Sequence, residues 1–201
     1  MTYRDLVQNY IAYYRPRRAA ERADFRGCRN LRHAVHEATL PNGKCHVHQR
    51  RVGKKKLQLA SRRLLDNLTQ LRAARTFDEL HAAVKNIISS DGVGKLASYD
   101  VADRLGMYLR LEPKLVYLHA GTLRGARSMG LQGPGPLKKS QLPKELWSLT
   151  PAEREDFFCI YGPAFGKRRS RAGGITPRRL GFRCAVPSAC RPRADVRASC
   201  P

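Results

Sequence analysis

Apolar residues recur at every third or fourth position along most of residues 1–165, which is the period of an α-helix. The longest such run lies at residues 56–74, where leucine and alanine are interleaved with basic and polar side chains. Thr76 and Glu79 then form a capping box, which places the start of the next helix at Phe77. The pattern predicts an all-α fold, with one compact multi-helix domain over residues 1–165 and roughly seven or eight short helices.

Proline and glycine mark the expected ends of these helices. Pro16 should break a first helix at residues 3–14, and another helix is expected at residues 25–38. Pro151 follows the capping residue Thr150, so a late helix should begin there. Two further helices are expected at residues 97–109 and 122–129.

The chain carries a formal charge of +23, which is distributed unevenly. Residues 1–75 contain 18 Lys or Arg and 5 Asp or Glu, whereas residues 76–161 contain 11 and 10. Residues 162–201 contain 10 basic residues and 1 acidic residue. A near-neutral middle between strongly basic segments attracts polyanions, so nucleic acid is the expected class of partner.

The composition changes near residue 166. Residues 166–201 are rich in arginine, proline, alanine and glycine, and they show no hydrophobic period. Such a segment buries too little apolar surface to offset its loss of conformational entropy, so a disordered basic tail is predicted. Two interpretations are open, a basic arm on nucleic acid or a segment without a folded role, and the second is favoured.

Nothing in the sequence indicates a membrane partner or export. No apolar run approaches the roughly 18 residues that span a membrane, and charges interrupt the N-terminal segment. The cytoplasm is therefore the expected location. The six cysteines form no Cys-x-x-Cys pair, and the histidines and cysteines between Cys28 and His48 match no zinc-ligand spacing. We expect no metal and no cofactor.

A glycine-rich turn separates two of the expected helices. One helix ends near Ser89, and Gly92-Val93-Gly94 precedes Lys95 and the next helix. Glycines allow close approach of another molecule to the backbone, and free N–H groups at a helix start favour an anion such as a phosphate. The pattern predicts a helix-hairpin-helix whose residues Gly92, Val93, Gly94 and Lys95 bind a nucleic-acid backbone. An ordinary corner between two helices, capped by glycine, has the same pattern.

A basic block precedes the run at residues 56–74. It offers forked guanidinium groups and ammonium groups, which hold phosphates without reading base sequence. The residues expected to contact nucleic acid here are His48, Gln49, Arg50, Arg51, Lys54, Lys55 and Lys56. A solvated charge run before a helix is the alternative interpretation.

The hairpin residues are followed by an apolar stretch with a histidine, and then by a segment that ends in an apolar–Gly–apolar turn. These positions are Ile88, Gly92, Val93, Gly94, Ala97, Val116, Tyr117, Leu118, His119, Met129, Gly130 and Leu131. In this order they resemble the helix-hairpin-helix DNA glycosylase superfamily, over residues 87–131. The resemblance implies a DNA-binding protein of the DNA repair type, which grips the phosphate backbone of duplex DNA with low sequence specificity.

The catalytic positions of that superfamily differ in this chain. Tyr117 stands where its catalytic aspartate is expected, and Leu96 stands where its lyase members carry a lysine. Base excision by a glycosylase or lyase acting on a flipped base is therefore the alternative function, with His119 and Tyr117 as candidate catalytic residues. An RNA-binding protein is the second alternative.

His119 is the residue best suited to proton transfer, because it stands just before an expected helix start. Asp100, Asp103 or Tyr117 are its possible partners, although a capping or core histidine is the commoner role. Both aspartates are expected on the exposed side of their helix. The strings at residues 48–51, 117–122 and 155–161 are similar to those of small uncharacterised bacterial proteins, which implies no activity.

Overall fold

The computed structural model describes residues 2–46, 49–131, 133 and 135–166. These residues form nine α-helices and no strand, with one isolated antiparallel bridge between Val116 and Leu137. The all-α fold class is therefore confirmed. The helices are α1 (Tyr3–Tyr13), α2 (Arg15–Arg26), α3 (Leu31–Thr39), α4 (Lys54–Asp66), α5 (Leu68–Ala73), α6 (Phe77–Ile88), α7 (Lys95–Leu109), α8 (Ala120–Ser128) and α9 (Pro151–Gly166).

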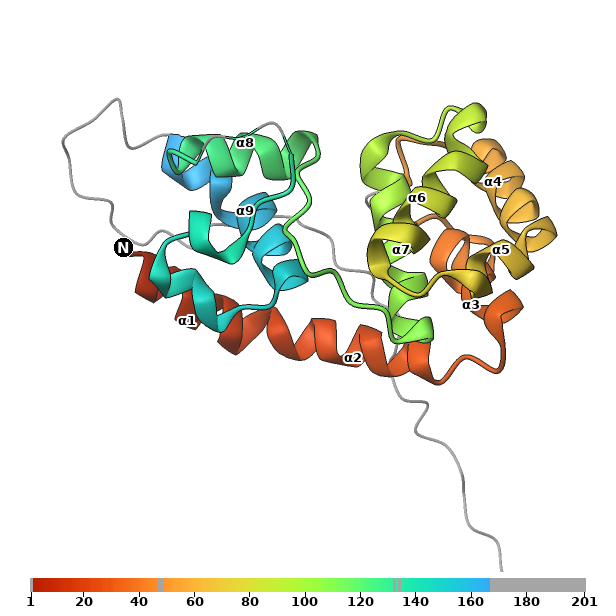
Figure 1. Ribbon diagram of the computed structural model, residues 1–201, viewed down its shortest axis with the longest axis horizontal. Coiled ribbons are helices and arrows are strands. Elements are labelled where there is room, and N and C mark those ends of the chain that lie inside the picture. Colours follow the sequence, from red (N-terminus) through yellow and green to blue (C-terminus); the bar gives the residue numbers. More distant parts are fainter. Residues whose placement is uncertain (1, 47–48, 132, 134, 167–201) are drawn as a thin grey trace, which may run out of the picture.

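The helices gather into two lobes (Figure 1). Helices α3 to α7 form one group, which we call the hairpin lobe, and α1, α8 and α9 form the other, which we call the α9 lobe. Helix α2 runs from the α9 lobe to the hairpin lobe, and the segment after α7 crosses back. Each lobe has its own cluster of buried apolar side chains. The surfaces where the lobes face each other therefore do not have to form a shared apolar core, and they can carry polar and charged side chains.

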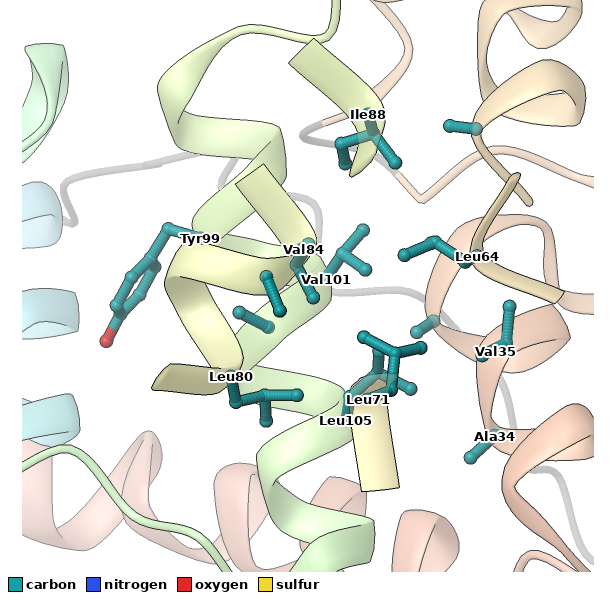
Figure 2. Close-up of a cluster of buried hydrophobic side chains, with 14 of the residues drawn as sticks. Ala34, Val35, Leu64, Leu71, Leu80, Val84, Ile88, Tyr99, Val101 and Leu105 are labelled. Carbon is teal, nitrogen blue, oxygen red and sulfur yellow. The ribbon is translucent and has the colours of Figure 1, made fainter. Parts of the chain in front are cut away.

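The core of the hairpin lobe is aliphatic and draws on α3 to α7 (Figure 2). Gly106 of α7 allows the helix to lie close to its neighbours, because a Cβ there would be 2.5 Å from the Leu111 carbonyl oxygen and 3.3 Å from the Phe77 ring. The labelled buried residues of this core include Val35, Leu64, Leu71, Leu80, Val84, Ile88, Val101 and Leu105.

The core of the α9 lobe combines aliphatic side chains with a group of aromatic rings. Phe157 and Phe158 are fully buried on α9, and the Phe157 ring centroid lies 6.4 Å from that of Tyr10 and 4.8 Å from that of Tyr161. Apolar residues therefore occur on all sides of α9, as is typical of a helix enclosed by its neighbours. Three charged residues of this helix, Glu153, Arg154 and Glu155, are consequently buried.

Several helix boundaries differ from the expected ones. The segment expected as one helix at residues 25–38 is two, because α2 ends at Gly27 and Asn30 caps α3 by accepting a hydrogen bond from the His33 N–H at 2.9 Å. The run at residues 56–74 is divided at Asn67 into α4 and α5. Both breaks are marked by residues that favour caps and turns, which the apolar period does not register.

Other boundaries are as expected. Thr76 accepts a hydrogen bond from the Glu79 N–H at 3.2 Å, and Thr150 accepts one from the Glu153 N–H at 3.3 Å. Pro16 ends one helix and stands in the first turn of the next, so the chain turns at Tyr14 and continues as α2.

No helix of the described ranges has both the length and the apolar character needed to cross a bilayer. Helix α9 continues to Gly166, the first residue of the expected tail. The rest of that tail, residues 167–201, lies outside the described residues.

Candidate functional site

The hairpin has the expected arrangement between α6 and α7. A short 3-10 turn at Ser89–Asp91 follows α6, and Gly92 then adopts a left-handed conformation with φ 68°. Val93 is buried in the core of the hairpin lobe, while Gly92 and Gly94 are exposed on either side of it. The Val93 side chain thus anchors the turn, and the glycine backbone is presented to solvent.

The hairpin lies against the start of α4. The Lys56 ammonium group is so close to Gly92 that a Cβ built on the glycine would be 3.1 Å from Nζ. Lys54, Lys55, Lys56 and Lys95 are all exposed. The tertiary structure therefore brings together the hairpin and the basic segment around the start of α4, which are far apart in the sequence. We use the name hairpin surface for the exposed residues of these two segments. Its members are Arg50, Arg51, Lys54, Lys55, Lys56, Gly92, Gly94 and Lys95.

Two helix N-termini belong to the hairpin surface. Gly53 caps α4 and Gly94 caps α7, and neither helix start has a side-chain cap or an acidic residue in its first turn. Both helices instead begin with lysine. A cation at a helix N-terminus opposes the helix dipole, and free N–H groups at the same place attract anions. An anion bound at either helix start would accept hydrogen bonds from its free N–H groups.

Three predicted contact residues differ from the expectation or cannot be placed. Gln49 is fully buried with its amide against the end of α3, so the prediction that it contacts nucleic acid is wrong. Its polar side chain satisfies backbone groups inside the hairpin lobe. Val93 can contribute only its backbone, because its side chain belongs to the core. His48 lies outside the described residues.

A cleft of about 640 Å³ opens between the two lobes. Helices α2 and α7, the start of α8 and the middle of α9 all contribute side chains to it. Leu96, two residues after Gly94, also lines the cleft, so the hairpin surface lies at its edge. The volume is within the range of sites for small molecules and cofactors.

The cleft is acidic although the protein is strongly basic. Seven of the 16 Asp and Glu residues of the chain line it, against three arginines. The acidic lining residues are Glu21, Asp24, Glu37, Asp100, Asp103, Glu155 and Asp156. The cleft interior and the hairpin surface therefore select opposite charges, and a phosphate would bind outside rather than inside the cleft.

His119 forms a buried pair with Glu155 inside the cleft. His119 is the N-cap of α8 and is 5% exposed, and its Nε2 contacts Oε1 of Glu155. Thr122 donates a hydrogen bond to the same Oε1 at 2.7 Å. Burial opposes the charged imidazolium, but the hydrogen bond and the charge of Glu155 outweigh it and raise the pKa of His119. A histidine and a carboxylate in such contact can take part in proton transfer with a bound molecule.

A second charged cluster borders this pair. The Arg18 guanidinium donates two hydrogen bonds to Asp103, both 2.8 Å, and one to Asp156 at 3.3 Å. The Tyr10 hydroxyl donates to Asp156 Oδ2 at 2.9 Å. Burial raises the pKa of Asp156 to about 7 despite Arg18. Arg18 of α2 thus forms ion pairs with both lobes, with Asp103 of α7 and with Asp156 of α9.

Asp100 and Asp103 do not lie on an exposed helix side, so that expectation is wrong. Asp103 faces Arg18, and its side chain is 12% exposed. Asp100 lines the cleft, and burial raises its pKa to about 7. The sequence pattern predicted that both aspartates are exposed, because the apolar residues of α7 account for packing against one core, that of the hairpin lobe. The second face of this helix packs against α2 and borders the cleft between the lobes, and both are formed by residues far from α7 in the sequence.

Tyr117, the other candidate catalytic residue, lies away from the cleft lining. Its hydroxyl donates a hydrogen bond to Asp78 of α6, and its ring packs against Phe77, His81 and Tyr99 at centroid distances of 4.9 to 5.5 Å. Burial and then Asp78 raise the pKa of Tyr117. The structure brings His119 to the cleft but places the Tyr117 hydroxyl on the other side of an aromatic cluster.

Glu155, Asp156 and Arg18 are site residues that the sequence interpretation missed. A signal for the two acids was present, since they directly precede Phe157 and Phe158 in a helix that is otherwise largely apolar. Adjacent carboxylates in such a helix must be buried together with it. No comparable signal marks Arg18, which is one of several arginines in the first turns of α2.

Within the described residues, no group of three or more His, Cys, Asp or Glu side chains is arranged to hold a metal ion. Comparisons of the chain with protein-family models, with curated proteins and with solved structures found no match. The function of the site must therefore be inferred from its own chemistry.

Proposed function

We propose that this protein binds duplex DNA through the phosphate backbone, with the hairpin surface as its contact region and with low sequence specificity. The observation that carries the proposal is the contact between Lys56 and Gly92, which merges the hairpin with the lysine-rich start of α4. The uncapped starts of α4 and α7, each with lysine as its first residue, support the proposal further. Phosphates are the anions that such a surface accepts without reading bases.

The proposal is tested by the dependence of binding on salt. Replacing Lys54, Lys55 and Lys56 with alanine should weaken binding to every duplex sequence alike. The log–log salt slope should fall by roughly 0.9 for each phosphate contact that is lost. Fluorescence anisotropy with short duplexes measures both quantities. An unchanged salt slope would show that the start of α4 does not contact the DNA.

Charge-matched controls separate a specific surface from general charge. Lys114, Lys138 and Lys144 are exposed and do not belong to the hairpin surface. Their replacement by alanine lowers the net charge by the same amount and should change affinity much less. Equal effects of the two triple variants would contradict the proposal. Tighter binding of double-stranded RNA than of DNA would favour the RNA-binding alternative.

A second candidate function follows from the cleft. A base extruded from a duplex held on the hairpin surface would meet the cleft at Leu96, where His119 and Glu155 lie inside. Cleavage of a glycosidic bond develops positive charge on the sugar, and a carboxylate stabilises that charge. The carboxylate that position 117 lacks would then come from α7 or α9. Water would attack the sugar carbon as the bond from that carbon to the base nitrogen breaks. The Glu155 carboxylate of the His119–Glu155 pair would take the water's proton, and the base would leave with a proton from solvent.

A further inference from the structure

Asp100 is a half-buried residue with one carboxylate oxygen that lies inside the protein. It stands on α7 and lines the cleft, and its Oδ2 atom is buried with no hydrogen-bond partner among the described residues. A buried polar oxygen left unpaired is costly, and in native proteins it is usually explained by a bound molecule or by function. The free oxygen points to a hydrogen-bond donor that is supplied from outside the chain.

The neighbours of Asp100 limit what that donor can be. Arg104 is the charged neighbour that acts most strongly on Asp100, and it pairs with Glu21 at 3.0 Å. Arg18 and His119 likewise pair with Asp103, Asp156 and Glu155. These cations are thus already paired with carboxylates, and acidic residues outnumber arginines in the lining, so the cleft disfavours a phosphate or a carboxylate, and the unpaired Asp100 oxygen disfavours a carbonyl edge. It favours an N–H donor that is neutral or positively charged.

The walls of the cleft favour a flat molecule. Tyr99 precedes Asp100 on α7, and Figure 2 shows its ring pointing away from the core residues Val84 and Val101. Its ring centroid lies 5.6 Å from that of His119 across the lobe boundary. Tyr99 is only 3% exposed, but the half-buried Tyr14 lines the same cleft, and proteins stack bases and other heterocycles on accessible aromatic rings.

We infer that the cleft binds an amino-bearing heterocycle of the adenine or cytosine type, whose exocyclic amino group donates a hydrogen bond to Asp100 Oδ2. Adenine and cytosine carry this group, whereas thymine and uracil present a carbonyl oxygen in its place. If the heterocycle is a base of DNA, the inference rests on the second candidate function, in which the cleft receives a base extruded from the duplex. The same chemistry also admits a free nucleoside.

Adenosine and inosine provide a matched test, since they differ at the amino group of the purine and inosine has a carbonyl there. We expect titration calorimetry with the full chain to show adenosine binding about ten- to a hundredfold more tightly than inosine. Asp100→Leu should abolish this difference. Asp100→Asn should keep most of it, because an amide oxygen still accepts from the amino group. Equal binding of both nucleosides to the unmodified protein would overturn the inference.

Two further measurements keep the interpretation unambiguous. Asp66→Leu, at an exposed position near the end of α4, is a control that should leave adenosine binding unchanged. Circular dichroism identifies any variant that fails to fold, and Asp100→Asn preserves the size of the side chain if Asp100→Leu does not fold.

Duplexes with one unpaired adenine or one unpaired hypoxanthine separate the two sources of the heterocycle. A preference for the adenine duplex that Asp100→Leu removes supports a base within DNA. Binding of free adenosine without any duplex binding would overturn the proposed DNA-binding function and leave the ligand class in place. Duplex binding with no preference for either base, and no adenosine binding, would overturn the ligand class alone.

Discussion

Gly125 of α8 and Gly162 of α9 lie in direct backbone contact, since a Cβ built on Gly162 would be 2.2 Å from the Gly125 Cα. Ser128 donates a hydrogen bond to the Gly162 carbonyl oxygen at 2.8 Å, and Thr122 donates one to Glu155. The two helices therefore run in the same direction, in a fixed register. This register places Glu155 beside His119, so two glycines remote from the cleft position its central pair.

Alanine at either glycine should destabilise the protein strongly. A Cβ at Gly125 would lie 2.0 Å from the Phe158 carbonyl oxygen, which is backbone and cannot move aside cheaply. We expect Gly125→Ala and Gly162→Ala each to lower the free energy of unfolding by at least about 2 kcal/mol. Gly135→Ala is the control, because no atom lies within 4 Å of its Cβ and it should change stability little. Urea unfolding followed by circular dichroism provides the comparison.

The two hairpin glycines should respond differently to substitution. Gly92 has a φ of 68°, so Gly92→Ala should cost about 1 kcal/mol of stability. Gly94 has a φ of −71° and no neighbour near its Cβ, so Gly94→Val should fold nearly normally. It should nevertheless weaken duplex binding, because a branched side chain blocks close approach of the backbone to phosphate. Normal DNA affinity in a folded Gly94→Val protein would argue against the hairpin as the contact.

Stability should fall as the pH rises from about 4 to about 7. Burial raises the pKa of Asp100 from 3.8 to about 7, so the folded state holds a proton over this interval that the unfolded state has lost. The raised pKa of His119 acts in the same direction, since its contribution is complete below the unfolded value and is lost above the folded value.

Asp100→Asn isolates the carboxylate part of this dependence. The variant should be more stable than the unmodified protein at pH 8 by about 1 to 4 kcal/mol, and the two should converge near pH 4. Unfolding in urea at several pH values measures the difference. Parallel curves for the two proteins would show that Asp100 does not retain its proton in the folded state.

Base release is the measurement that decides the second candidate function. If the cleft excises a base, purified protein should form abasic sites in duplexes with modified bases, and His119→Ala should lower the rate by about a hundredfold or more. Duplex affinity should stay nearly unchanged in that variant, because His119 is buried away from the hairpin surface. Tyr117→Phe is the control and should leave the rate close to normal. Absence of abasic sites over a broad substrate panel would leave DNA binding as the function.

Much of the fold follows from local sequence. The apolar period predicts an all-helical protein, and Thr76 and Thr150 mark helix starts that the structure reproduces. The Gly92-Val93-Gly94 turn is also local, because only a short stretch of backbone decides it. Gly27 and Asn67 end helices that the period alone would continue, and Asn30 begins a new one. Whether such a residue interrupts a helix depends on the capping hydrogen bonds that form there, and the spacing of apolar residues does not report on these bonds.

The candidate site depended on contacts between distant parts of the chain. His119 was identified from its position before a helix, but its partner Glu155 comes from a helix 36 residues later, brought there by the Gly125–Gly162 contact. Asp100 and Asp103 look exposed on one helix because the sequence does not show that α2 packs against it or that both aspartates line the cleft. Local hydrogen bonding and side-chain pattern thus determined the helices and the hairpin. Only tertiary packing, which buries charges against remote partners, decided where the acidic cleft lies and which residues share it.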